Sequence, residues 1–483
     1  MIKSITFEHF RNLKGTYYFN NNLNIIFGKN NSGKSNILDG IRLAFSGITN
    51  EYFKVKKSDF NDSNDDNPIT IKVILSENTI ESLSCYDENG NLCYGFIFIV
   101  KKLSNGKYIK KITLLNECSI DFDILREDEN IPNIYSIPLI RIDDIYTDWL
   151  STGISKFIES NEKYNDLKNQ SKKNILSSMD NKIKEFQSFC SKFNQNMKIE
   201  LSEPKISDEK VYIVDGDKEH NYCIGSGYKS IANIILNLME ENYNIILIDE
   251  IENHLHPSLL RTLIREIRSL NKKSQIIATT HSPIVVNELL NDELMDVTGK
   301  KLDSIDQNNR KKLEKFLHPG RSEIAFADNV VLVEGYTEEM LLKHYLSFNE
   351  NYNFTVVNVA GIMFEPYIDL CKLLNKKTVV ISDTDIALSE NMEASSRFQN
   401  LKKLCTDKGI KLLEVYNTLE SDLYINGFLK NLQNMLICID DMNDLYVAKN
   451  GKKTLIAESI INQNIDLSEW HIIKDIKNEF TSN

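Results

Sequence analysis

Basic residues do not outnumber acidic residues in this chain of 483 residues: 57 Lys and Arg stand against 69 Asp and Glu, a formal net charge of −12. A protein that coats nucleic acid with its whole surface is therefore excluded. A local basic groove is not, because binding to phosphates depends on where Lys and Arg lie. Glycine and proline are scarce, with 19 and 8 residues, which excludes a collagen-like or Pro/Gly-rich chain.

The cysteines also lack a pattern. The chain has 8 of them and no C-x-x-C pair, so neither a zinc ribbon nor a redox dithiol is expected. Scattered thiols in a large chain are typical of a reducing compartment. The first residues lack the apolar core of a signal peptide, and no run approaches the ~18 apolar residues that a membrane-spanning helix needs. We expect a cytoplasmic protein without a membrane partner.

The hydrophobic pattern predicts α/β segments that are interrupted by a purely helical stretch. At ~100–200 residues per domain, the length predicts two to four domains. Alternating or continuous apolar runs predict strands over 2–10 and 23–27, and a β-rich region over 53–115. Between 145 and 200 the apolar residues recur at helical spacing, which predicts two or three amphipathic helices. Helices and strands alternate again to about 290 and from 329 onward, on either side of a polar linker.

A complete phosphate-binding loop follows the second predicted strand. The octet G-K-N-N-S-G-K-S matches G-x-x-x-x-G-K-[ST], with an apolar strand before it and a helix after it. The backbone N–H groups of such a loop curl around phosphates at the helix N-terminus. Lys34 would reach the β and γ phosphates, and the Ser35 hydroxyl would bind Mg²⁺. The predicted ATP-binding residues of this loop are Gly28, Asn30, Asn31, Ser32, Gly33, Lys34 and Ser35.

An apolar strand over 244–248 ends in Asp249 and Glu250, as a Walker B strand does. Asp249 would hold Mg²⁺ and Glu250 would orient the attacking water. Such a strand is weak evidence alone, but an upstream G-S-G segment with Ser226 and Gly227, an E-N-H-L-H-P tail and a later T-T-H-S-P segment accompany it. A lone histidine after a strand is usually structural, yet this order of motifs favours a switch role for His281.

The order of these motifs resembles the ABC-type ATPase heads of the RecF, SMC and OLD (overcoming lysogenisation defect) proteins. The opening I-T-F-E-H-F-R-N resembles theirs too. The resemblance implies that Ser226 and Gly227 cap ATP bound by a second copy, and that His281 contacts the γ-phosphate. Residues 145–200 stand where SMC proteins insert their arms, and they either dimerise or pack on the same chain. The chain departs from the pattern because no glutamine lies between Ser35 and Gln170. Asp59 could replace the missing Q-loop glutamine, and slow hydrolysis is expected.

A second group of acids follows two later strands. Glu334 and Gly335 follow an apolar strand, Glu338 follows one turn on, and Asp383 and Asp385 end another apolar strand. Ligands gather at the C-terminal ends of strands in open α/β sheets. Carboxylates that meet there repel one another unless a divalent cation neutralises them. Isolated acids would be helix caps or solvated, but the set predicts one or two Mg²⁺ or Mn²⁺ ions.

Glu-Gly after one strand and Asp-x-Asp after another resembles a Toprim domain. An ABC-type head followed by Toprim is the arrangement of OLD-family endonucleases, including those of Gabija systems. By this resemblance the metal ligands for Mg²⁺, Mn²⁺ or Ca²⁺ are Glu334, Glu338, Asp383, Asp385 and Glu420. Gly361 matches the glycine after the second strand, and Lys453, preferred over Lys452, would stabilise the transition state. Two such cations ~3.5–4 Å apart can activate a water and stabilise a leaving 3′ oxygen.

The sequence thus predicts an α/β protein: an ABC/SMC-like P-loop ATPase head with a helical insertion, followed by a C-terminal Toprim domain. The expected parts are a first lobe 1–144, the insertion 145–200, a second lobe 201–315 and Toprim 320–483. The predicted function is that of an ATP-binding, metal-dependent DNA endonuclease in anti-phage defence. Its predicted catalytic residues are Glu334, Asp383, Asp385 and Lys453 for DNA cleavage and Glu250 for ATP hydrolysis. We expect a homodimer or higher oligomer, with a helicase or retron-type nucleic acid as a further partner.

Two other function classes stay open at this point. A RecF-like or SMC-like ATP switch on DNA would share the head but lack the complete acidic set. Topoisomerases and primases also use Toprim. A topoisomerase, however, needs a nucleophilic tyrosine and DNA-gate domains, for which the residues after 320 leave little space. A primase rarely carries an ABC-type head.

Overall fold

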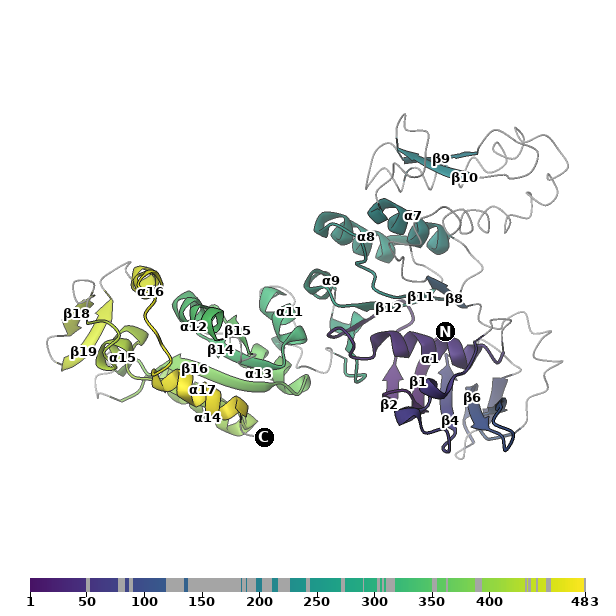
Figure 1. The fold of residues 1–483 in the computed structure, drawn as a ribbon, viewed down its shortest axis with the longest axis horizontal. Helices are drawn as coiled ribbons and strands as arrows, with labels where there is room; N and C mark the ends of the chain where they lie inside the picture. Colours follow the sequence, from purple (N-terminus) through teal and green to yellow (C-terminus); the bar gives the residue numbers. More distant parts are fainter. Residues whose placement is uncertain are drawn as a thin grey trace. The chain divides into compact units, whose positions relative to one another are not determined.

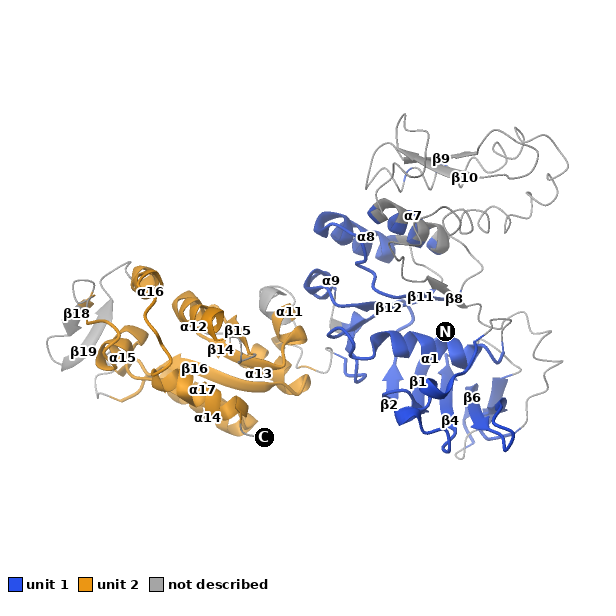
Figure 2. Cartoon of the chain, viewed as in Figure 1, with its two compact units in different colours: residues 1–301 blue, residues 302–483 orange. Residues whose placement is uncertain are grey.

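A computed structural model describes most of the chain, and Figure 1 draws the other residues as a thin grey trace. Apart from a few single positions, the described ranges are 1–48, 53–76, 83–86, 90–118, 134–137, 197–201, 211–215, 226–239, 244–270, 274–289, 291–301, 318–349, 354–361, 364–386, 393–430, 436–439, 442–448 and 453–481. Nearly all of the predicted helical insertion, and Lys452, lie outside these ranges. The chain divides into two compact units, Met1–Lys301 and Leu302–Asn483 (Figure 2).

An antiparallel sheet forms the first part of unit 1. Its strands run in the order β2-β1-β4-β6-β5, and β7 pairs with β6. Buried and less buried residues alternate along β4, as expected for a sheet with one covered face. The strands are β1 (Ile2–Phe10), β2 (Leu13–Tyr18), β4 (Ile69–Leu75), β5 (Ser84–Tyr86), β6 (Leu92–Lys102) and β7 (Tyr108–Leu114), with short 3₁₀ turns at Lys57–Asp59 and Asn61–Ser63.

A parallel sheet forms the second part of unit 1, in the order β13-β3-β12-β11-β8. Every residue of β3, β11 and β12 is buried, as expected for strands inside a parallel sheet that is covered on both faces. Because β3, β12 and β11 are parallel neighbours, the segments that follow them emerge at one edge of the sheet. The strands are β3 (Leu23–Phe27), β8 (Ile134–Ile137), β11 (Ile245–Ile248), β12 (Gln275–Thr280) and β13 (Leu294–Asp296).

Helix α1 (Lys34–Phe45) contacts strands of both sheets, and Figure 1 shows it between them. Its buried face joins a core rich in phenylalanine, where Phe45 meets Phe96 edge to face at 5.3 Å between ring centroids. The other described elements of unit 1 are the paired strands β9 (Met197–Leu201) and β10 (Val211–Asp215), the helices α7 (Ser226–Met239), α8 (Pro257–Leu270) and α9 (Pro283–Glu288), and a 3₁₀ turn at Asn291–Glu293.

Unit 2 is built on a parallel sheet in the order β15-β14-β16-β17. Its strands are β14 (Asn329–Val333), β15 (Thr355–Asn358), β16 (Lys377–Asp383) and β17 (Lys411–Val415). Residues of α12, α16 and α17 form one core with the sheet, while α13 and α14 pack on each other and on β16. The helices are α11 (His318–Phe326), α12 (Tyr336–Phe348), α13 (Phe364–Leu373), α14 (Ser396–Lys408), α15 (Leu419–Ile425), α16 (Lys453–Asn462) and α17 (His471–Thr481), and a hairpin joins β18 (Leu436–Ile439) to β19 (Met442–Ala448).

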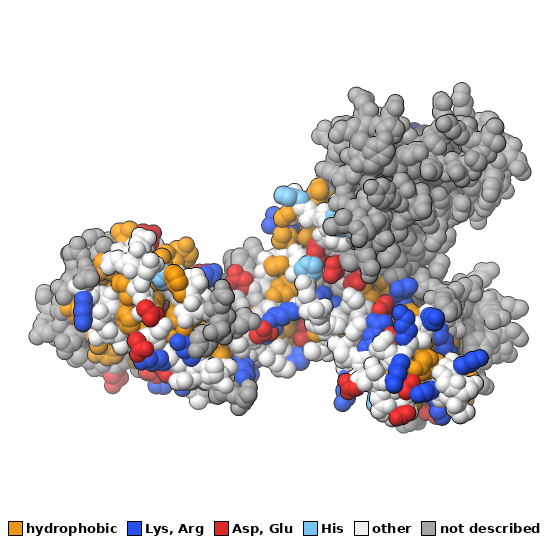
Figure 3. Space-filling model, viewed as in Figure 1, with side chains coloured by type: hydrophobic (Ala, Val, Ile, Leu, Met, Phe, Trp, Pro, Cys, Tyr) orange, Lys and Arg blue, Asp and Glu red, His pale blue; other side chains and the backbone are white. Residues whose placement is uncertain are grey.

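Basic side chains gather on one face of unit 1, although the chain is acidic as a whole. Figure 3 shows Lys and Arg over the region of β1, β4, β6 and α1. On β6, β7 and the turn between them, Lys101, Lys102, Lys107, Lys110 and Lys111 are exposed. A chain with a negative net charge can therefore still have a local basic surface. No helix in the described part of the chain has the length and apolarity that spanning a bilayer requires.

Candidate functional site

The phosphate-binding loop connects β3 to α1 in unit 1. Gly33 stands before the helix at φ 100°, in the left-handed region, and a Cβ there would come within 2.6 Å of the Asn12 amide. This position therefore requires glycine. The Lys34 ammonium donates to the carbonyls of Gly28 and Lys29 at 2.8 and 2.7 Å. Burial lowers the pKa of Lys34, while the nearby acids Glu250, Glu252 and Asp249 act in the opposite direction.

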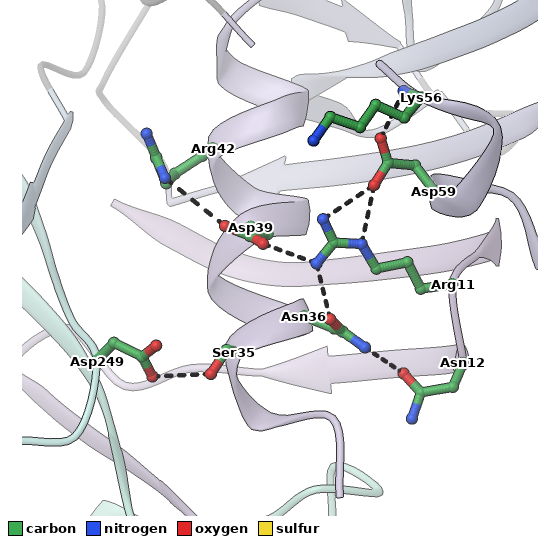
Figure 4. Close-up of polar contacts among 9 residues, drawn as sticks. All are labelled: Arg11, Asn12, Ser35, Asn36, Asp39, Arg42, Lys56, Asp59 and Asp249. Carbon is green, nitrogen blue, oxygen red and sulfur yellow. Dashed lines mark hydrogen bonds and ion pairs between the residues drawn. The ribbon is translucent and has the colours of Figure 1, made fainter. Parts of the chain in front are cut away.

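The Walker B acid lies beside the loop, as the order of the strands requires. The Ser35 hydroxyl donates to Asp249 Oδ1 at 3.1 Å, drawn in Figure 4. Thr279 at the end of β12 donates to the same oxygen at 2.6 Å and accepts from the Glu250 backbone N–H at 2.8 Å. Glu250 has φ 51°, an unfavourable backbone conformation for a residue with a side chain. The two predicted Mg²⁺ ligands, Ser35 and Asp249, therefore meet.

His281 follows β12, and Glu252 orients it. Glu252 Oε1 lies 3.1 Å from His281 Nδ1 and accepts from the His281 backbone N–H at 2.5 Å, while its Oε2 accepts from Thr280 at 2.7 Å. Glu250 Oε1 lies 3.9 Å from the same ring nitrogen. The histidine side chain is 41% exposed. The sequence did not assign a role to Glu252, because a third acid after a Walker B strand has no distinctive spacing.

Asp59, the proposed substitute for the missing glutamine, is engaged elsewhere. Its Oδ1 accepts from Arg11 Nε at 3.0 Å and Nη2 at 2.9 Å, and its Oδ2 accepts from the Lys56 backbone N–H at 2.8 Å (Figure 4). The Asp59 side chain is 4% exposed. Both oxygens are thus used in a buried structural contact, which argues against a role for Asp59 at the γ-phosphate.

The G-S-G segment is described only from Ser226 onward, where α7 begins. A Cβ on Gly227 would lie 2.5 Å from the backbone oxygen of His254, in the tail that follows the Walker B acids. This close approach of two backbones requires glycine at position 227. Its predicted contact with a second copy stays a prediction.

In unit 2 the predicted acids follow neighbouring parallel strands. Glu334 follows β14, Asp383 ends β16, and β14 pairs with β16. The Ser382 hydroxyl donates to Glu334 Oε2 at 3.3 Å. Gly361, at φ 94° after β15, donates its N–H to the Glu334 backbone oxygen at 2.8 Å. Gly361, which the Toprim resemblance matched to the glycine after the second strand, therefore lies against the backbone of Glu334.

A hydrogen-bonded pair of loops brings Glu420 to the same edge. The Asn417 backbone N–H donates to the Thr384 hydroxyl at 2.8 Å, and the Asp385 N–H donates to the Asn417 carbonyl at 2.8 Å. Thr418 then caps α15 by accepting from the Ser421 N–H at 3.4 Å. These bonds fix the Asp383–Asp385 segment to the start of the helix that carries Glu420.

Burial and neighbouring acids raise the pKa of three of these carboxyl groups. Burial, followed by Glu338, Glu334 and Glu420, raises the pKa of Asp383 well above its ordinary value. Burial, followed by Glu334 and Glu420, raises the pKa of Glu338. Burial and Glu334 also raise the pKa of Asp385. Carboxyl groups whose pKa is raised by burial and by nearby acids lie close together in a desolvated place, as functional carboxylates often do.

Lys453, at the start of α16, faces the same acids. Desolvation disfavours its charge, but Glu420, Asp383, Glu338 and Glu334 raise its pKa above the ordinary value. The lysine that was preferred from the sequence is therefore coupled to four of the five predicted ligands. Its neighbour Lys452 lies outside the described residues.

The donor set fits a hard divalent cation. Glu420 is 1% exposed, and its Oε2 is buried without a hydrogen-bond partner. A buried anionic oxygen that lacks a partner is costly, and a bound cation would satisfy it. In this structure, no group of three His, Cys, Asp or Glu side chains within the described ranges is close enough to hold a metal ion. Binding would therefore have to draw these carboxylates together.

Asp422, in the same T-L-E-S-D segment, is a structural acid. Its carboxylate accepts from Trp470 Nε1 at 2.6 Å, lies 3.0 Å from His471 Nε2, and is 3% exposed. It ties α15 to the start of α17. The segment therefore divides its two acids between Glu420, at the carboxylate edge, and Asp422, inside the fold.

Comparison with protein families assigns both units. Residues 121–286 match the AAA ATPase domain, and residues 326–385 match the overcoming lysogenization defect protein-like TOPRIM domain. The chain carries an AAA ATPase domain and an OLD-like Toprim domain. The Toprim match contains Glu334, Glu338, Gly361, Asp383 and Asp385. The phosphate-binding loop lies before the ATPase match.

The chain is also homologous to two proteins named endonuclease GajA. It is 27% identical over 280 residues to that of Bacillus cereus strain HuB5-5, which covers 47% of this chain and 39% of the relative. It is 26% identical over 441 residues to that of strain VD045, which covers 79% of this chain and 75% of the relative. The first alignment thus spans well under two thirds of that relative.

Among solved structures, an SMC head bound to the C-winged helix domain of ScpA is similar, with a TM-score of 0.45 and 15% identity over 61% of this chain and 93% of that one. A score this low adds no weight to an assignment that rests on the P-loop, the parallel sheet and the two domain matches.

Proposed function

We propose that this chain is an ATP-binding DNA endonuclease of anti-phage defence whose Toprim edge cuts phosphodiesters with divalent cations. The observation that carries the proposal is the carboxylate edge of unit 2, within and beside the OLD-like Toprim match. There Glu334 directly follows β14, Asp383 ends the paired parallel strand β16, and Glu420 keeps a buried oxygen without a partner. The homologous proteins named endonuclease support the same activity.

Each residue of the edge would have a separate task. Glu334, Glu338, Asp383, Asp385 and Glu420 would hold the cations, which supply a more acidic water and stabilise the leaving 3′ oxygen. Lys453 would offset the charge that develops on the phosphate. The bonds between Asn417, Thr384 and Asp385 would keep the ligands in place. Mg²⁺ and Mn²⁺ are the cations that we expect.

In unit 1, Lys34 and Ser35 would bind the ATP phosphates and Mg²⁺, with Asp249 as the second protein ligand of that ion. Glu250 would orient the attacking water, and His281, aligned by Glu252, would sense the γ-phosphate. Because Ser226 and Gly227 would act on ATP bound by another copy, the functional form would be a dimer or higher oligomer.

The test is the nicking of a supercoiled plasmid by the full chain. We expect relaxed and linear products in Mn²⁺ or Mg²⁺, no products in EDTA, and free DNA ends. Intact plasmid at every cation concentration would refute the proposal. DNA ends attached covalently to protein would show a topoisomerase instead.

A further inference from the structure

A guanidinium that the sequence did not single out lies at the carboxylate edge. Arg397, in the first turn of α14, places Nη2 at 2.5 Å from Glu334 Oε1 and donates to the Gly361 carbonyl at 3.2 Å. Its Nη1 lies 4.0 Å from Asp385 Oδ2. One side chain thus touches the segments that follow β14, β15 and β16, where the predicted metal ligands are.

The simplest explanation for the position of Arg397 is an ion pair that stabilises the fold. Other contacts, however, already hold α14 in place. Ser395 caps the helix by accepting from the Phe398 N–H, and Gly409 ends it in the left-handed conformation. Phe398 and Leu401 anchor it in the core. The Arg397 side chain is 38% exposed, and ion pairs at such exposure contribute little stability. Its position therefore calls for another explanation.

Arg397 and Lys453 are coupled to overlapping but different sets of acids. The charge of Lys453 is coupled first to Glu420, then to Asp383, Glu338 and Glu334. The charge of Arg397 is coupled to Glu334, Asp385 and Asp383. A guanidinium has five N–H donors in a planar fork that matches the oxygens of a phosphate. Two of those donors suffice for Glu334 and Gly361, so donors remain for a phosphodiester.

We propose that Arg397 is a phosphate-contacting residue of the Toprim site, which Glu334 holds in the metal-free protein and releases to a DNA phosphodiester when a divalent cation takes over that carboxylate. The proposal rests on the nuclease function proposed above. Its physical basis is competition, because a cation and the guanidinium favour the same Glu334 oxygens. Arg397 should therefore weaken metal binding but strengthen the interaction with DNA.

The first measurement is Mn²⁺ binding to the full chain without nucleotide and without DNA, by calorimetry or by electron paramagnetic resonance of free Mn²⁺. Removal of the competing positive charge in Arg397→Gln should tighten binding roughly three- to tenfold. Arg397→Lys keeps the charge and should stay within about twofold of wild type. Asp383→Asn, which lacks a proposed ligand of the Toprim site, measures how much Mn²⁺ binds elsewhere in the chain. Lys402→Gln, on the same helix as Arg397, breaks an exposed ion pair with Glu414 of β17; it is the matched control and should change nothing.

The second measurement is plasmid cleavage at saturating Mn²⁺. Arg397→Gln should lose on the order of 100-fold in rate despite its tighter metal binding, as expected when a donor to a transition-state oxygen is removed. Arg397→Lys should recover part of the rate. A residue that only supports the fold would instead lower the melting temperature and weaken metal binding together.

Two results would overturn the proposal. Mn²⁺ binding by Arg397→Gln that is no tighter than in wild type would remove the competition for Glu334. Cleavage by Arg397→Gln at the wild-type rate would remove the phosphate contact. If wild type itself leaves the plasmid intact, the nuclease function fails, while the Mn²⁺ titration still decides whether Arg397 and the cation compete.

Discussion

At the scale of single residues, the carboxylates of unit 2 determine how the metal-free protein responds to pH. The pKa values of Asp383, Glu338 and Asp385 are raised by burial and by neighbouring carboxylates, with Glu334 among them in each case. The folded state therefore binds more protons at these groups than the unfolded chain does. Their contribution to stability is fully present below the unfolded pKa values and is lost as the pH rises through the raised folded values.

This predicts an unusual dependence of melting temperature on pH. In EDTA, the transition of unit 2 should occur at a lower temperature as the pH rises from about 5 to about 8. Mn²⁺ should restore it most strongly at the higher pH, since protons and cation compete for the same oxygens. Calorimetry of wild type and Asp383→Asn checks this. The variant should show a flatter pH profile in EDTA, and an equally steep profile would contradict the assignment.

The sequence predicted the positions of some site residues but not of others, and the difference has a physical reason. The P-loop and the Asp-x-Asp strand have fixed local spacing, so their positions at strand ends could be predicted. Arg397 could not, because an arginine in the first turn of a helix after a polar loop looks like any solvated residue. Only the order of β14, β15 and β16 in the sheet brings it to Glu334. The engagement of Asp59 with Arg11 was missed because it joins segments 48 residues apart.

At the scale of elements, a single arginine links the β1–β2 turn of unit 1 to α1 and to the turn before β4. Arg11 Nη1 donates to Asn36 Oδ1 and Asp39 Oδ2, both at 2.7 Å, while its other nitrogens bind Asp59 (Figure 4). Asn36 in turn donates to Asn12 at 2.6 Å, and Asn12 to the Ser32 carbonyl at 3.4 Å. Arg11 is therefore connected to the phosphate-binding loop through Asn36 and Asn12.

Removal of this link should cost more than an ordinary surface contact. Arg11→Ala leaves the buried Asp59 carboxylate without its main partner, and we expect unit 1 to lose about 2–3 kcal/mol of unfolding free energy. Arg42→Ala removes only a half-exposed pair with Asp39 at 3.6 Å and should cost less than about 1 kcal/mol. Denaturant titrations of both variants give the comparison, and equal losses would show that the Arg11 network has no special role.

At the scale of the whole molecule, one chain carries the predicted nucleotide site in unit 1 and the proposed nuclease site in unit 2. A nuclease without control would endanger host DNA, so we infer that nucleotide occupancy alters cleavage. Pairing of two ATPase units across ATP offers a route, because Ser226 of one copy would act on the loop of another.

Titration of ATP against plasmid cleavage, at fixed free Mg²⁺ so that chelation is not mistaken for regulation, tests this coupling. Wild type should change its cleavage rate with ATP. Lys34→Ala, which loses the ammonium of the phosphate-binding loop, should keep its basal rate and respond weakly. Identical responses of the two proteins would remove the coupling.

The most direct test of the central claim is plasmid cleavage by Asp383→Asn. The substitution is nearly isosteric and removes one charged ligand from the carboxylate edge, and a misplaced metal typically costs several orders of magnitude in rate. We predict that cleavage falls at least about 1,000-fold while ATP binding and the melting transition of unit 1 stay unchanged. Asp407→Asn, at an exposed position of α14, should cleave as wild type does. Cleavage by Asp383→Asn at a rate near wild type would contradict the Toprim nuclease account.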